Sequence, residues 1–90
     1  MELCRTIAMM VSKDYRERMK AEFYQVNERT IRLREMLKAW DAGKLGFEPA
    51  SPRHLLDAQL QAMQAYRDIL KGRAAMEGVE LDADEVEEGD

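Results

Sequence analysis

The sequence predicts an all-α fold, an antiparallel helical hairpin of two long helices packed into a homo-oligomeric bundle. Two long segments carry apolar residues at helical spacing, and a Gly- and Pro-rich stretch separates them. The 90 residues suffice for one domain and no more. The predicted parts are an N-terminal extension (1–12), a hairpin (13–78) with helices at about 13–42 and 52–77 around a loop (43–51), and an acidic tail (79–90) that we expect to be disordered.

The first long helix is predicted to begin at Ser12, whose hydroxyl can cap the first turn, and to end at Gly43 and Gly46. Its apolar positions follow a seven-residue repeat typical of a coiled-coil seam: Met19, Phe23, Val26, Thr30, Leu33, Leu37 and Trp40. A rod of about 42 Å is too long to be buried by a compact monomer with one partner helix, so the length favours a second chain.

The second helix is predicted to start at Ser51 as N-cap, with Pro52 in the first helical position, and to stop at Gly78. Its apolar residues cover an arc of about 220°, whereas a one-sided surface helix needs little more than about 100°. One edge of the arc is small (Ala58, Ala62, Ala65, Gly72) and the other is bulky (Leu56, Met63, Leu70). We therefore expect the hairpin partner on one face and a neighbouring subunit on the other.

The charge divides the chain into a basic body and an acidic tail. The formal net charge is −4, but residues 1–76 contain all 14 basic residues against 10 acidic ones, and residues 77–90 contain 8 acids and no base. Such a tail buries too little apolar surface to offset its ordering entropy. Masking of the chain's own basic face by the tail is a second interpretation.

Composition excludes several classes of site. The single Cys4 and the single His54 leave no internal disulfide, no multi-cysteine metal site and no Ser-His-Asp triad, and no phosphate-binding loop or dinucleotide motif is present. We expect no enzyme, no cofactor and no metal. The apolar run at Met1–Val11 is too short to span a bilayer, so we also expect an intracellular protein with no membrane contact.

Two sets of polar residues are candidates for ligand binding. On the first helix, a stripe of basic and amide residues falls within an arc of about 60° and is bordered by aromatic rings. Arginine grips phosphate oxygens while a ring stacks on a nucleobase, although the same stripe can be a solvated face that pairs with nearby glutamates. On the second helix, Gln59, Arg73 and Glu77 lie beside Tyr66 within the apolar arc, where they form either an intersubunit network or a polar pocket. A further alternative is that Arg73 and Glu77, four residues apart, pair with each other. The stripe comprises Lys13, Arg16, Lys20, Asn27, Arg34 and Lys38, and the predicted ligand-binding residues are Arg16, Lys20, Phe23, Tyr24, Asn27, Arg34, Gln59, Tyr66 and Arg73.

Several motifs resemble a family of small helical proteins of tailed phages that has a crAss-like-phage relative. They are the run from Tyr15 to Glu22, the run from Lys38 to Pro49, and the ending from Arg73 to Leu81, of which Phe47-x-Pro49 is among the most specific. Members commonly carry Cys where this chain has Ser51, so no role of that thiol is transferred. The resemblance covers residues 13–81 and implies a phage or prophage accessory protein acting in the host bacterial cytoplasm.

The resulting hypothesis is a counter-defence protein that binds and sequesters a nucleotide-derived immune signal without catalysis, in an architecture similar to the helical-hairpin anti-CBASS and anti-Thoeris sponges. Arg16, Lys20, Arg34 and Arg73 would hold phosphates, the aromatic rings would stack on bases, and Asn27 and Gln59 would read base or ribose edges. The predicted partners are a second copy of the chain and a nucleotide second messenger. One alternative is an inhibitor or adaptor that binds a host defence protein through the apolar helix face or the acidic tail. Another is a regulator that binds nucleic acid.

Overall fold

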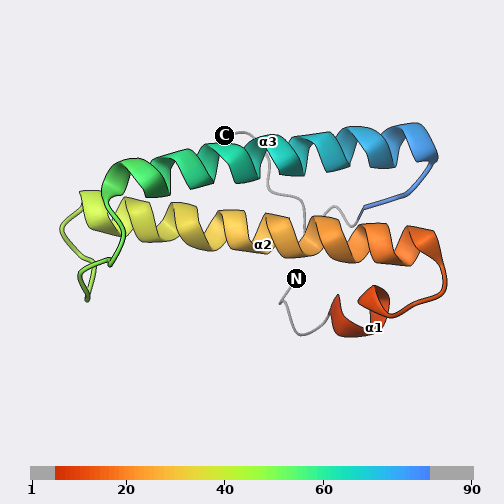
Figure 1. Ribbon diagram of the computed structural model, residues 1–90, viewed down its shortest axis with the longest axis horizontal. Coiled ribbons are helices and arrows are strands. Elements are labelled where there is room, and N and C mark those ends of the chain that lie inside the picture. The colour runs from red at the N-terminus through yellow and green to blue at the C-terminus, as the bar shows by residue number, and fades with distance from the viewer. Residues whose placement is uncertain (1–5, 82–90) are drawn as a thin grey trace.

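The computed structural model describes residues 6–81 and is helical, with a short helix α1 (Ile7–Met10) and two long helices, α2 (Tyr15–Asp41) and α3 (Arg53–Glu77). Helices α2 and α3 lie side by side and run in opposite directions, joined by the turn at one end (Figure 1). The predicted pair of long packed helices is thus confirmed. Within the described residues, no helix combines the length and the apolar character needed to cross a membrane.

Helix α2 begins at Tyr15, two residues later than the predicted start at about residue 13, and the predicted cap at Ser12 is wrong. The N-cap is Asp14, whose backbone is extended (ψ 118°) and whose side-chain Oδ1 accepts a hydrogen bond of 2.9 Å from the Arg16 amide. Ser12 instead accepts a hydrogen bond from the amide of Asp14 (3.1 Å). Both residues are good caps in sequence, and the carboxylate nearer the apolar repeat is the one that the chain uses.

The turn between the helices begins with Gly43, which has a positive φ of 70°, and ends at Pro52. Pro52 is the N-cap of α3 rather than its first helical residue, and no side chain caps the helix, so the predicted cap at Ser51 is wrong. Arg53 instead fixes the start of α3. Its guanidinium bonds to both carboxylate oxygens of Asp41 (2.7 and 3.2 Å) and lies 5.2 Å from the ring centroid of Trp40.

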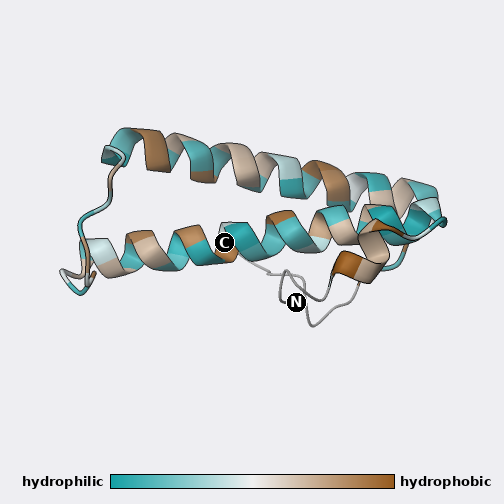
Figure 2. Cartoon of the chain, turned by 60° about the horizontal axis from the view of Figure 1, so that its bottom comes forward, coloured by the Kyte–Doolittle hydropathy of each residue, from teal (hydrophilic) through white to brown (hydrophobic). Residues whose placement is uncertain are grey.

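The core lies along the predicted seam of α2. Met19, Phe23, Val26, Thr30 and Leu37 are all buried, and Phe23 and Thr30 have no exposed surface. From α3 the buried residues are Arg67, Leu70 and Ala74. Leu70 packs against Phe23, Tyr24 and Val26. Hydrophobic residues recur along both long helices (Figure 2).

Both ends of the described chain fold back onto the hairpin. From the predicted N-terminal extension, α1 packs against α2, where the Gln25 amide donates a hydrogen bond of 2.8 Å to the Thr6 hydroxyl. After Gly78, whose left-handed backbone (φ 70°) ends α3, Val79 packs against Met19 and Ala74. Val79 and Leu81 are therefore part of the packed structure. The remaining acidic residues of the predicted tail (82–90), and Cys4, lie outside the described residues.

Candidate ligand-binding site

The open end of the hairpin, where α2 begins and α3 ends, contains a polar hollow of about 340 Å³. The first turns of α2 form one wall, and the chain that returns after Gly78 forms the other. This volume is at the lower end of the range for ligand pockets, about 300 to 1,000 Å³, and suits a phosphate-bearing group rather than a whole dinucleotide. The lining residues are Asp14, Arg16, Glu17, Lys20, Gly78, Val79 and Glu80.

The two basic residues of the hollow, Arg16 and Lys20, both belong to the predicted phosphate-binding set. They lie four residues apart on α2 and so share one face of the helix. Lys20 pairs with Glu17 (Nζ to Oε1, 3.5 Å), whereas the described part of the chain places no carboxylate in ion-pair contact with the exposed Arg16. An incoming anion would compete with Glu17 for Lys20 and would find Arg16 available.

Arg73 brings a third predicted cation to the same end of the hairpin. Its guanidinium donates a hydrogen bond of 2.7 Å to the Tyr15 hydroxyl and lies 3.5 Å from a carboxylate oxygen of Glu77. The neighbouring Tyr15, through electrostatic attraction and its hydrogen bond, is the main cause that raises the pKa of Arg73, and Glu77 adds to the effect. Arg73 is therefore a cation held against the start of α2, where its partner Tyr15 is the residue directly before Arg16.

Four predicted ligand residues are buried in the hairpin. Phe23 and Tyr24 belong to the core and meet edge to face, with ring centroids 5.6 Å apart. Asn27 and Arg34 are 2% and 7% exposed. Asn27 and Arg34 each come one residue after a seam position of α2, so both lie at the edge of the contact between α2 and α3. In this structure the two rings contribute to stability, and stacking on a ligand by either would require them to leave the core.

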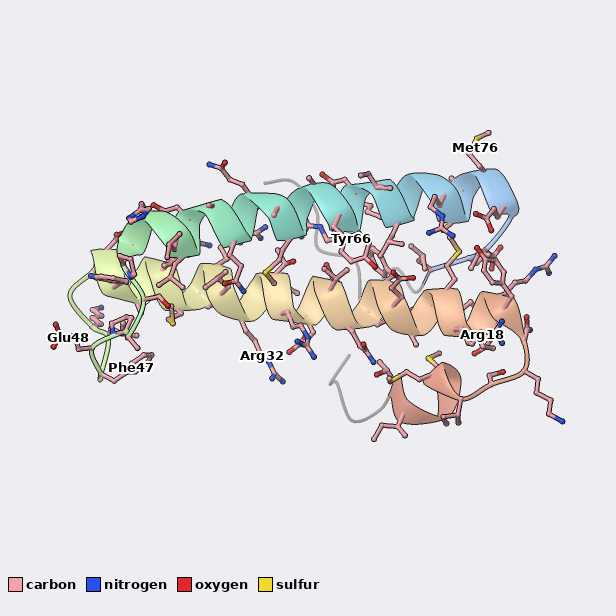
Figure 3. The ribbon with its side chains drawn as sticks, viewed as in Figure 1. Arg18, Arg32, Phe47, Glu48, Tyr66 and Met76 are labelled. Atoms are coloured by element: carbon pink, nitrogen blue, oxygen red, sulfur yellow. The ribbon has the colours of Figure 1, made fainter. Side chains whose placement is uncertain are left out.

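The two remaining predicted residues, Gln59 and Tyr66, lie on α3 away from the hollow. Gln59 is exposed, and its side-chain amide donates a hydrogen bond to the Met63 sulfur (3.6 Å). Tyr66 is 42% exposed, and Figure 3 shows its position near the middle of α3. Together with Arg73 they form a row with a spacing of seven residues, which places all three along one side of α3.

A second hollow, which the sequence analysis missed, lies in the turn at the opposite end of the hairpin. It encloses about 300 Å³ and is lined by Trp40, Gly43, Leu45, Phe47, Glu48 and Pro49. Phe47 is 59% exposed, and Figure 3 shows it with Glu48 at the tip of the turn. The signal available in the sequence was Phe47-x-Pro49, one of the motifs that carry the resemblance to the phage proteins.

Comparison with known proteins gives one family match. The model of the family described as Sequestin matches residues 13–76, which is most of the hairpin and includes Arg16, Lys20 and Arg73. Neither a curated protein nor a solved structure matches the chain.

Proposed function

The chain belongs to the Sequestin family, and on this premise we propose that it binds and sequesters a small phosphate-bearing signal without chemical change. The observation that carries the proposal is the hollow at the open end of the hairpin, where Arg16 and Lys20 face a common space and Arg73 lies nearby. Guanidinium and ammonium groups at such a site suit phosphate oxygens. The family name agrees with a sequestering role.

The finer proposal is a nucleotide-derived immune signal. A nucleotide combines phosphate with a planar base, and the resemblance to small tailed-phage proteins supplies a setting, counter-defence in the host bacterial cytoplasm, in which capture alone is useful. Sequestration requires affinity and abundance rather than a reaction. The family name and the two basic residues of the hollow, Arg16 and Lys20, support the binding, and the phage setting rests on the resemblance alone.

Thermal unfolding with a panel of nucleotides tests this proposal. The panel contains cyclic di- and trinucleotides, cyclic ADP-ribose isomers and mononucleotides. A ligand at 100 times its Kd adds about 2.7 kcal/mol to the apparent stability. For a domain of this size that free energy raises Tm by roughly 10–20 °C. No shift with any member of the panel would contradict the proposal.

Substitutions locate the site. A charge-assisted hydrogen bond contributes about 1.5–3 kcal/mol, so Arg16→Gln and Lys20→Gln should each weaken binding roughly 10- to 150-fold. Arg32→Gln is the matched control, because Arg32 is an exposed cation on α2 that pairs only with Glu28 (3.0 Å) among the described residues and projects away from α3 (Figure 3). Equal losses in all three variants would place the ligand elsewhere.

Inhibition of a host protein is the second candidate function. Exposed apolar residues on α3, Leu55, Ile69 and Met76 among them, favour it, and it requires that no second copy of the chain covers them. A tail-dependent interaction should be tested by removing residues 82–90 only. Removal from residue 79 onward would also delete Val79, which is 6% exposed, and so would confuse loss of binding with loss of fold.

A further inference from the structure

Helix α3 carries two apolar seams on opposite faces. The inner seam, on the side of α3 that carries its buried residues, is apolar except for Arg67. It consists of Leu56, Leu60, Met63, Arg67, Leu70 and Ala74, all buried or half-buried. A second repeat is shifted by two residues along the chain from the inner seam. Because two residues turn an α-helix by about 200°, this second repeat lies on the opposite face of α3. We call this second repeat the outer seam, and it consists of Leu55, Ala58, Ala62, Ala65, Ile69, Gly72 and Met76.

Every residue of the outer seam is exposed. Leu55, Ile69 and Met76 retain 54%, 60% and 89% of their surface, and Met76 projects away from α2 (Figure 3). The seam has no polar side chain over about 32 Å of helix, since 22 residues rise about 1.5 Å each. A seven-residue apolar repeat of this kind is the pattern by which helices pair, and here nothing in the described chain covers it.

Gly72 indicates what approaches the seam. It lies inside α3, where glycine is less favourable than alanine, and a Cβ at this position would meet no atom within 4 Å. Its φ is not in the positive range, so the backbone does not require glycine either. Nothing within the described residues therefore accounts for glycine here, and close approach of another helix would account for it.

We propose that the outer seam packs against the same seam of a second copy, antiparallel, about a two-fold axis near Ala65. The spacing of the seam is almost the same in both directions from Ala65, as a two-fold interface requires. Ala58 then faces the partner's Gly72, and Ala62 faces the partner's Ile69, so a small residue receives the bulky one. In a parallel pair, Ile69 would pack against Ile69 of the partner. The two bulky side chains would then keep the helices apart where the small residues lie.

The flanking residues fit the same arrangement. In an antiparallel pair Arg73 lies opposite the partner's Gln59, and Asp68 lies opposite the partner's Gln61, so no like charges meet. The two Tyr66 rings lie on the same side of the pair, near the axis. If the proposed ligand binding holds, the row Gln59, Tyr66 and Arg73 is completed by the second copy, but the pairing itself does not depend on that binding.

The oligomeric mass without ligand tests the pairing. By light scattering at micromolar concentration, the wild-type chain should have twice its mass of 10.4 kDa. Ala65→Lys places an unpaired charge at the axis and should raise the dimer dissociation constant on the order of 100-fold or more. Gln64→Lys adds the same charge one residue away, outside the seam, and should leave the dimer intact. A monomeric wild type, or a dimer that Ala65→Lys leaves intact, would overturn the proposal.

Two further variants test the close approach and the direction. Gly72→Ala should weaken the wild-type dimer about tenfold, and should stabilise the monomeric Ala65→Lys chain because alanine favours the helix. In a Cys4→Ser background, Ala65→Cys should form a disulfide between copies and Ala58→Cys should not. A disulfide through Ala58→Cys would overturn the antiparallel arrangement, and a tighter dimer in Gly72→Ala would overturn the close approach.

Discussion

Leu70 and Ile69 are neighbours on α3 with opposite environments, and shortening each to alanine tests the two-faced helix directly. Leu70 is 1% exposed and packs against Phe23, Tyr24 and Val26. Leu70→Ala removes buried carbon atoms and leaves a cavity, which costs about 2–5 kcal/mol. At roughly 4–8 °C per kcal/mol, Tm should fall by roughly 8–40 °C.

Ile69 is 60% exposed, and Ile69→Ala should change the stability of the single chain by no more than about 0.5 kcal/mol. The comparison is made in the monomeric Ala65→Lys background, so that loss of a dimer contact is not counted as loss of fold. Urea unfolding followed by far-ultraviolet circular dichroism gives both free energies. A cost below about 1 kcal/mol for Leu70→Ala, or equal costs for the two variants, would refute the assignment of the inner and outer seams.

Two further predictions concern pH and backbone conformation, and a third concerns the ligand site. The hydrogen bond from Arg53 lowers the pKa of the Asp41 carboxyl below its usual value of 3.8. The stabilisation that ionised Asp41 contributes is therefore present above about pH 4 and is lost as pH falls through the lower pKa of the folded state. Asp41→Asn should lower Tm at neutral pH, and the difference in Tm from wild type should disappear in acid. Gly78→Ala places a side chain at a φ of 70° with open space around it, so unfolding in urea should show a loss of about 1 kcal/mol from backbone strain alone, and an unchanged stability would contradict that conformation. Glu17→Gln removes the competitor for Lys20 and should tighten binding of any ligand found by the thermal panel, whereas weaker binding would place Glu17 among the ligand contacts.

The periodic parts of the fold could be predicted from the sequence because they depend on many residues. The seven seam positions of α2, six of them apolar, repeat in register, so one position that is only half-buried, such as Leu33, does not change the predicted seam. The helix ends were harder to predict, because Ser12 and Asp14 are both good caps and only tertiary packing selects between them. Helix α1 has four residues, which is too short for a periodic signal.

The candidate site was predicted in part, for a related reason. Arg16 and Lys20 share a helix face, which spacing reveals, but the second wall of the hollow depends on the return of the chain after Gly78. Asn27 and Arg34 were assigned to the same stripe because they share its angle. Residues at that angle lie at the edge of the contact with α3, where a small rotation of α2 about its own axis decides whether a side chain is buried or exposed. Helical spacing alone does not resolve such a rotation.

The most direct test of the central claim is the fate of the ligand after capture. The purified chain is mixed with each member of the nucleotide panel at equimolar amounts and filtered to remove free ligand, and the retained fraction is heat-denatured and analysed by mass spectrometry. Sequestration predicts that one class of nucleotide is depleted from the filtrate and is recovered chemically unchanged after denaturation. Recovery of a cleaved product, or no depletion of any member, would contradict it.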